Sequence, residues 1–274
     1  MKKLLIPILF LLFPISFSCE ELLTTQLSDD EIVEGLKAAL DIGLDNSVAT
    51  ASVQDGYLKH EIIKILLPPE VKALQDKIQN ESISLFNGVV NIQYADIMSA
   101  YVLLAPNISI DPFEELIVAM NKGAENAADK ALPIFGNAIV NMSISDGLSI
   151  LQGDSTAATD YFYTNTNTAL ITAFQPDVKN ALDQTKANGI YQDLVGFLNF
   201  QYEFNYLLGT QTLKVSDYIN LSLPATLDEY ATQKATDGLF HLVGEEEKKI
   251  RKDPFAWASD IIAKVFGSIE AQGG

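Results

Sequence analysis

The sequence has few of the residues from which most catalytic and metal-binding sites are built. Its one cysteine, Cys19, leaves no partner for an internal disulfide, and only His60 and His241 carry imidazole groups. The chain contains no Gly-x-Ser-x-Gly, His-Glu-x-x-His or Gly-x-x-x-x-Gly-Lys motif, which are common signatures of hydrolases, zinc proteases and nucleotide-binding proteins. We therefore predict a protein without enzymatic activity, cofactor or metal.

Basic residues are also scarce. The chain has 18 Lys and Arg residues against 36 Asp and Glu residues, a formal net charge of −18. Such a surface repels phosphate backbones, and the sequence offers no basic stripe that would bind them. Nucleic acid is therefore excluded as an expected partner, and lying flat on an anionic membrane is disfavoured as well.

The chain has no apolar run of the roughly 20 residues that a membrane-spanning helix needs. Its longest such segment, Leu4 to Phe13, follows Lys2 and Lys3 and is followed by small residues up to Ser18. A basic start, a short apolar segment and a small-residue cleavage site are typical of a secretory signal peptide. We predict that residues 1–18 are that signal.

Cys19 stands where a lipoprotein signal peptidase leaves the new amino terminus. It is either incidental or the attachment site of a lipid, and Ser16-Phe17-Ser18 resembles a loose lipobox without the usual leucine. We favour lipidation, because two or three acyl chains anchor a protein stably. The prediction is an exported lipoprotein of the bacterial cell envelope, held in the outer membrane on its periplasmic or surface face, with residues 19–27 as a tether.

Helix signals dominate the rest of the chain and predict one all-α, bundle-like domain over residues 28–270. Ser28 to Glu31 and Thr226 to Glu229 have the pattern of capping boxes, and Asp111-Pro112 is a typical helix start. Helical spacing of apolar residues follows each of them. The small residues Ala124, Ala127 and Ala131 predict close approach of a neighbouring helix.

Signals for other structure are weak. The run Thr164-Asn165-Thr166-Asn167-Thr168 has poor helix propensity and predicts a kink or loop. Residues 83–94 and 213–223 show the best alternation for a strand. We therefore expect at most a short β-hairpin or extended segment within the helical domain.

Two groups of polar residues on the predicted helix after Asp228 are candidate sites. Asp237, His241 and Glu245 share one face, but that face lies opposite the apolar stripe, so we interpret it as solvated and salt-bridging rather than metal-binding. Glu246 falls within the stripe itself, where a carboxylate must be paired or protonated. We predict an internal ion pair, with Arg251 or a basic residue of another helix, rather than catalysis.

Aromatic residues cluster between Tyr191 and Tyr206. Phe197, Phe200 and Phe204 repeat there at helical spacing, which indicates a helix face in the core. The alternative is that these three rings line a pocket for an apolar ligand.

Several stretches together resemble the bacterial domain-of-unknown-function family 4197, whose members are envelope proteins and in many cases predicted lipoproteins. The resemblance implies no activity, cofactor or site residue. Two regions, 82–110 and 197–215, are longer and more apolar or aromatic than the family pattern, so we expect the choice of partner to differ there. The stretches that carry the resemblance are Glu34 to Leu40 with Gly43, Met120 to Glu125, Pro133 to Phe135, Gly147, Ala157 to Phe162, Phe174 to Pro176, Asp237 to Phe240, Glu245 to Glu247, Ile250-Arg251, Pro254 and Val265 to Gly267.

Three functional hypotheses follow. The first is a non-enzymatic envelope lipoprotein whose helical body binds another envelope component. The second is a carrier or sensor of an apolar small molecule held between helices and lined by the aromatic segment. The third, an envelope hydrolase that uses Glu246, has the least support.

The anchor gives the first testable prediction. Cys19→Ser removes the only thiol that can be acylated, so the protein should move from the membrane fraction to the soluble fraction and lose the acyl mass at its amino terminus. Ser18→Ala, which keeps the thiol, should stay in the membrane fraction. A wild-type mature protein that begins without modification at another residue, as seen by mass spectrometry, would contradict the prediction.

Overall fold

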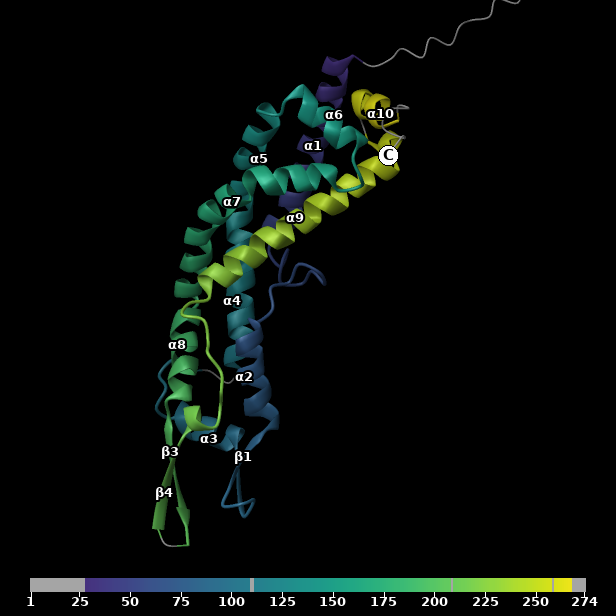
Figure 1. The fold of residues 1–274 in the computed structure, drawn as a ribbon. Coiled ribbons are helices and arrows are strands. Elements are labelled where there is room, and N and C mark those ends of the chain that lie inside the picture. Colours follow the sequence, from purple (N-terminus) through teal and green to yellow (C-terminus); the bar gives the residue numbers. More distant parts are fainter. Residues whose placement is uncertain (1–27, 109–110, 208, 258, 268–274) are drawn as a thin grey trace, which may run out of the picture.

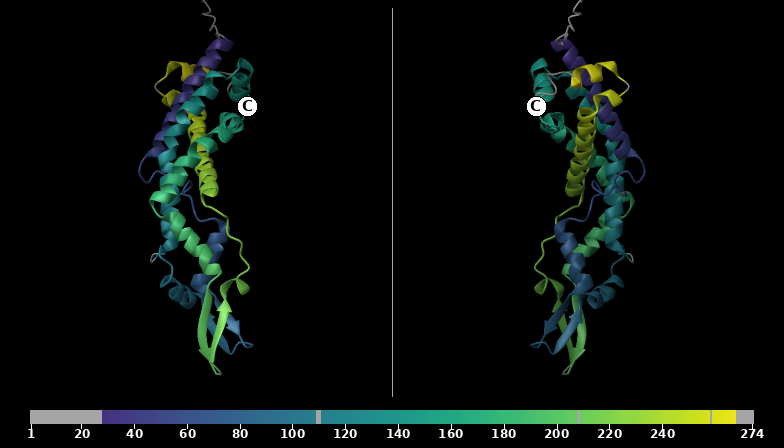
Figure 2. Two further views of the ribbon diagram at one scale, coloured as in Figure 1. Left: turned by 90° about the vertical axis from the view of Figure 1, so that its left-hand side faces the viewer. Right: turned by 90° about the vertical axis from the view of Figure 1, so that its right-hand side faces the viewer.

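A computed structural model describes residues 28–108, 111–207, 209–257 and 259–267. The predicted signal peptide and tether, with Cys19, lie outside these described residues. The chain folds into a mostly helical, elongated single domain, as predicted (Figures 1 and 2). The helices are α1 (Asp29–Ser52), α2 (Pro69–Asn80), α3 (Tyr94–Val102), α4 (Pro112–Ala127), α5 (Ala131–Val140), α6 (Ile144–Gln152), α7 (Ala157–Gln184), α8 (Ala187–Leu198), α9 (Asp228–Lys252) and α10 (Asp260–Phe266), with short 3-10 turns η1 (Ala128–Lys130), η2 (Val215–Asp217) and η3 (Pro254–Ala256).

The strands form two separate antiparallel hairpins. They are β1 (Ser82–Leu85) with β2 (Val90–Gln93), and β3 (Gln201–Tyr206) with β4 (Gly209–Lys214). Both hairpins project from the same end of the molecule, opposite the start of α1 (Figure 1). The first hairpin confirms the strand prediction for residues 83–94, with a turn between its two strands. The strand prediction for residues 213–223 was wrong beyond Lys214, where β4 ends, and β3 lies in the aromatic segment that the sequence predicted to be helical. Two hairpins therefore form where at most one was expected.

The long helices α1, α4, α7 and α9 form the body. Helix α7 packs along both α4 and α9, and α1 packs along α9 and α10. The predicted close approach to α4 is confirmed, and its tightest point is Gly123, where a Cβ would lie 2.9 Å from Cα of Val178 on α7. Ala124, Ala127 and Ala131 are fully buried beside it.

The helix starts follow the predicted signals with one exception. Ser28 and Glu31 form a capping box at α1, and Asp111 caps α4. The second capping box, at Thr226, was wrong: α9 begins one residue later than that pattern requires, with Leu227 as its cap and no side-chain capping bond.

The kink predicted at Thr164 to Thr168 was also wrong, because these residues lie inside the continuous helix α7. Their side chains bond back to carbonyls one turn earlier: Thr164 Oγ1 to Asp160 O at 2.9 Å, and Thr166 Oγ1 to Phe162 O at 2.6 Å. Short polar side chains that usually compete with a helix are here bonded within it.

No single described helix has the length and apolar composition of a membrane span. One pair of segments, Pro112–Val140 and Ile144–Gln152, meets that composition when counted together but is bent by 107°.

Buried polar side chains fasten the irregular segment after α1 to the body. Asn121 on α4 is fully buried; its Oδ1 accepts from Ile65 N and its Nδ2 donates to Ile65 O, both at 2.8 Å. Glu125, one turn further, accepts from the backbone nitrogens of Tyr57 and Leu58, each at 3.2 Å. These two side chains supply the hydrogen bonds that a strand partner would otherwise provide.

We predict that Asn121→Ala lowers the free energy of unfolding by about 3 kcal/mol, because it leaves two buried backbone groups of Ile65 unpaired. Asn141→Ala is the matched control: its Nδ2 bonds only to Asn137 O on an exposed surface, so the loss should be about 0.5 kcal/mol or less. Urea unfolding followed by circular dichroism measures both. Equal losses in the two variants would show that Asn121 does not fix the segment.

Candidate functional site at the hairpin end

The tip of the first hairpin has three consecutive residues in the left-handed backbone region, and one of them is a phenylalanine. Phe86 and Asn87 have φ angles of 52° and 54°, and Gly88 follows at 89°. The Gly88 N–H donates to Leu85 O at 3.1 Å, which closes the turn. Asparagine and glycine are common in this left-handed region, but a phenylalanine is uncommon. The fold thus holds Phe86 at a strained position, with 49% of its surface exposed, beside Val89, which is 69% exposed.

The second hairpin has a similar tip. Leu207 has a φ of 31° and is 84% exposed, and Gly209 follows at 127°. The two hairpins touch through the rings of Phe86 and Tyr206, which stack with centroids 4.7 Å apart and an interplanar angle of 12°. Stacking joins the two tips into one surface, which we call the hairpin tip surface: Phe86, Val89, Tyr206 and Leu207.

The hairpins are almost free of charge in a strongly acidic chain. Residues 82–95 contain no charged side chain, and neither do residues 204–213. Each described sheet has only two strands, so the outer edge of each strand offers unpaired backbone N–H and C=O groups. An uncharged surface with apolar tips and open strand edges is suited to contact with another apolar chain.

The sequence drew attention to these segments without showing their geometry. The regions 82–110 and 197–215, where we expected the choice of partner to differ, contain β1, β2 and α3, and β3 and β4. They come together at one end of the molecule (Figures 1 and 2). The Asn87-Gly88 pair between apolar runs was the signal for the first turn. The second turn, at Leu207, carries no turn-forming signal before Gly209.

The three phenylalanines predicted as core or pocket lining are placed differently from one another. Phe197 is fully buried at the end of α8, and its ring lies 5.7 Å from that of Tyr101. Phe200 follows the helix and packs on the same tyrosine at 5.1 Å. Phe204 lies on β3 and is half-buried. Their helical spacing is broken after Phe197, so they do not share one helix face.

The structure corrects the ion pair predicted for Glu246 of α9. Glu246 is at the edge of the buried face, with 13% of its side chain exposed, and it pairs with Lys249 at 2.6 Å and accepts from Asn46 at 3.0 Å. Its neighbour Glu247 is the deeply buried carboxylate, 6% exposed, and Arg251 pairs with Glu247 at 2.9 Å. Arg251 therefore forms the internal ion pair with a carboxylate one residue away from the predicted one.

Glu247 also caps another helix. Its carboxylate accepts from the backbone nitrogens of Ala158 and Thr159, each at 2.9 Å, and from Thr159 Oγ1 at 2.8 Å, at the start of α7. The amino end of a helix has unpaired N–H groups and a partial positive charge, which a carboxylate satisfies. Every one of these contacts is structural, and the oxygens of Glu247 are already engaged.

The predicted polar face of α9 holds local pairs. Asp237 accepts from Gln233 at 2.8 Å and from Lys234 at 3.0 Å, and Glu245 pairs with Lys248 at 2.9 Å. Within the described parts of the chain, no three His, Cys, Asp or Glu side chains are grouped so as to hold a metal ion.

Comparison with known proteins gives one match. The model of a family described as protein of unknown function (DUF4197) matches residues 26–267. This match agrees with the resemblance found in the sequence. No curated protein and no solved structure matches the chain.

We predict that Glu247→Gln lowers the free energy of unfolding by about 3 kcal/mol, because it leaves the buried guanidinium of Arg251 without its counter-charge. Glu245→Gln changes an exposed pair on the same helix and should cost about 0.5 kcal/mol or less. Chemical denaturation of both variants measures the difference. If Glu247→Gln were as stable as Glu245→Gln, the ion pair would contribute nothing to the fold.

Proposed function

We propose a function for this chain, which belongs to the DUF4197 family of proteins of unknown function, from the placement of its own residues. The protein is a non-enzymatic lipoprotein of the bacterial envelope, anchored through Cys19, that binds another envelope protein with its hairpin tip surface. The observation that carries the proposal is the joining of two hairpins, whose apolar tips carry no charge, at one end of an acidic molecule.

The arrangement of the two ends supports this proposal. Ser28, the first described residue, lies at the start of α1, at the end of the molecule opposite the hairpins (Figures 1 and 2). The proposed anchor at Cys19 precedes Ser28 by only nine residues. The anchor therefore attaches at one end, and the hairpin tip surface is presented at the other.

The chemistry of the hairpins favours a polypeptide partner over a lipid bilayer. Open strand edges carry backbone groups that find no hydrogen-bond partner in hydrocarbon, so insertion beyond the tips is costly. An extended segment of another protein can pair with such an edge and pack apolar side chains against Phe86, Val89 and Leu207. The lack of charge in residues 82–95 and 204–213 matches a segment that is itself uncharged.

The carrier hypothesis has one observation in its favour, though not at the predicted residues. A hollow of about 480 Å³ lies between α2, α3 and the start of α4, lined by Ile78, Met98, Val102, Ile108 and Phe113 among others. Its size and its partly apolar lining, which also includes Gln79, Ser99 and Asp111, suit a small amphipathic ligand. Native mass spectrometry of protein purified from its own envelope separates the two ideas: a retained lipid-sized mass supports the carrier, and a co-purifying protein supports the binding role.

The proposal predicts site-specific crosslinking. A photoreactive residue at Val89 should give one defined protein adduct, whereas the same residue at Val140, 75% exposed on α5, should not. Leu207→Asp should weaken the Val89 adduct about tenfold, because it places a charge in the apolar contact. Since Leu207 is 84% exposed, the variant should fold as the wild type does.

The crosslinked peptide identifies the kind of partner. Mass spectrometry should place the crosslink in an uncharged, apolar segment of the other protein. Equal adducts at Val89 and Val140, an adduct that Leu207→Asp leaves unchanged, or adducts to lipid alone at Val89 would each overturn the proposal.

A further inference from the structure

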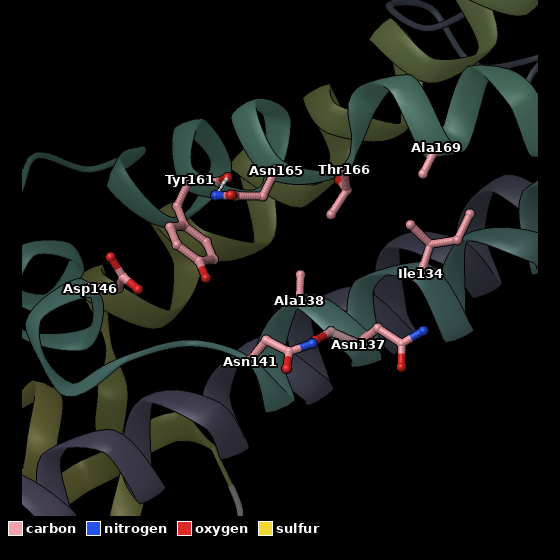
Figure 3. A pocket seen from close by; sticks show the side chains of 9 residues that line it. All are labelled: Ile134, Asn137, Ala138, Asn141, Asp146, Tyr161, Asn165, Thr166 and Ala169. Carbon is pink, nitrogen blue, oxygen red and sulfur yellow. Dashed lines mark hydrogen bonds between the residues drawn. The ribbon is translucent and has the colours of Figure 1, made fainter.

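A groove far from the hairpins carries several asparagine side chains. It has a volume of about 580 Å³ and lies between α5, the start of α6 and α7 (Figure 3). Three asparagines line it: Asn137 on α5, Asn141 directly after α5 and Asn165 on α7. The other lining residues are Ile134, Ala138, Asp146, Tyr161, Thr166 and Ala169. A second hollow of about 310 Å³ adjoins it and shares Asp146, Tyr161 and Asn165. The two hollows form one open, elongated groove that passes the ring of Tyr161.

Two of the asparagines are held in place by their own helices. Asn165 Nδ2 donates to Tyr161 O, and Asn141 Nδ2 donates to Asn137 O, both at 2.8 Å. Each bond uses a donor and fixes the amide, which leaves its Oδ1 as an acceptor with no partner among the described residues. The groove thus carries acceptors that are already held in one orientation, so a ligand that binds them loses little side-chain conformational entropy.

Asp146 and Tyr161 add an anionic acceptor and a hydroxyl group. The Ser143 hydroxyl and backbone N–H donate to Asp146 Oδ2 at 2.7 and 3.0 Å, and these bonds lower the pKa of the Asp146 carboxyl. Burial, and then the charge of Asp146, raise the pKa of Tyr161. The phenol therefore stays protonated, and its hydroxyl makes no hydrogen bond within the part of the chain that the structure describes.

These groups define the ligand by chemistry. Acceptors predominate, so the ligand must bring several donors, and the flat face of Tyr161 offers a surface for C–H groups. An anion is disfavoured by the net charge of −18. A compact cation is disfavoured because the Asp146 charge is already bonded at the amino end of α6. Asp160, the other carboxylate that lines the second hollow, is exposed to solvent, so its charge is screened, and the remaining side-chain acceptors are uncharged amides and hydroxyls. A neutral, hydroxyl-rich molecule satisfies all three conditions.

We propose that this groove binds a neutral saccharide, a linear oligomer of N-acetylated hexose units. The acetamido N–H donates a hydrogen bond to a free asparagine Oδ1, as in a hydrogen bond between two amides. The sugar hydroxyls donate to the Asp146 carboxylate, and they can both donate to and accept from the Tyr161 hydroxyl. The second hollow accepts a neighbouring unit. An open groove takes an internal part of a long glycan without requiring a free end.

The test is a titration of the full-length protein with chitotetraose, followed by ligand-observed saturation-transfer NMR and calorimetry. Cellotetraose, which lacks the acetamido groups, and spermidine, a compact polycation, are titrated in parallel. We expect chitotetraose to bind at least about fivefold more tightly than cellotetraose, and spermidine to give no signal that chitotetraose displaces.

Two variants and two controls locate the binding. Asn165→Ala and Tyr161→Phe should each weaken chitotetraose binding about tenfold. Asn80→Ala is matched to the first, because Asn80 Nδ2 makes the same bond to Asp76 O, one turn earlier on α2, outside the groove. Tyr218→Phe is matched to the second, because Tyr218 is 45% exposed and lies beyond the groove. Both controls should bind as the wild type does.

The outcomes decide the proposal. It is overturned if chitotetraose does not bind at about 10 mM, if spermidine competes with it, or if Asn165→Ala and Tyr161→Phe bind as well as their controls. Melting curves of the four variants separate loss of binding from loss of fold. None of these results tests the hairpin tip surface, so this inference and the proposed function can each fail without the other.

Discussion

The ion pair between Glu247 and Arg251 is the contact on which the half of the domain opposite the hairpins depends. Glu247 holds the first residues of α7, while the Arg251 guanidinium donates to the carbonyls of Ile150 and Leu151, at 2.6 and 3.3 Å, where α6 ends. The guanidinium also lies 5.7 Å from the ring centroid of Phe266 on α10. Two adjacent turns of α9 thus contact three other helices. Glu247 and Arg251 supply polar partners to the start of α7 and the end of α6, and Arg251 also packs against an aromatic ring of α10.

The contacts of Arg251 suit an arginine better than a lysine. Arg251 is the only arginine in the chain; every other basic side chain apart from the histidines is lysine. A guanidinium presents several donors in a fixed plane, so it can bind a carboxylate and two carbonyls together, which a single ammonium does less well. The other described ion pairs of α9, such as Lys249 with Glu246, lie nearer the surface and connect positions within one helix.

Much of the fold could be predicted from local sequence signals, and the failures have identifiable causes. Ser28 and Asp111 marked helix starts because their capping bonds involve only residues three positions away. The helix through Thr164 and Thr166 could not be predicted from propensity, since burial and packing of α7 between α4 and α9 outweigh it.

The candidate sites were predicted less completely. The helical period placed Glu246 in the apolar stripe of α9. However, Thr159 of α7 lies beside Gly244 of α9, and this contact widens the buried face of α9 toward Glu247. The aromatic segment was predicted to be one helix because Phe197, Phe200 and Phe204 have helical spacing. In the structure α8 ends at Leu198 and β3 begins at Gln201, so the spacing crosses from a helix into a strand. The stacking of Phe86 on Tyr206 joins residues 120 positions apart, which no local pattern reveals.

The packing of α1 against α9 and α10 has a consequence for the order of assembly. Helix α1 packs against α4, α5 and α6, but it also needs two partners from the last part of the chain, α9 and α10. Asn46 donates a hydrogen bond to Glu246, and Glu31 pairs with Lys264. Contacts of such sequence separation close slowly and only after the whole polypeptide is present. A nascent chain that lacks α9 and α10 therefore leaves the face of α1 that packs against them uncovered, and the core stays incomplete until both helices have been made.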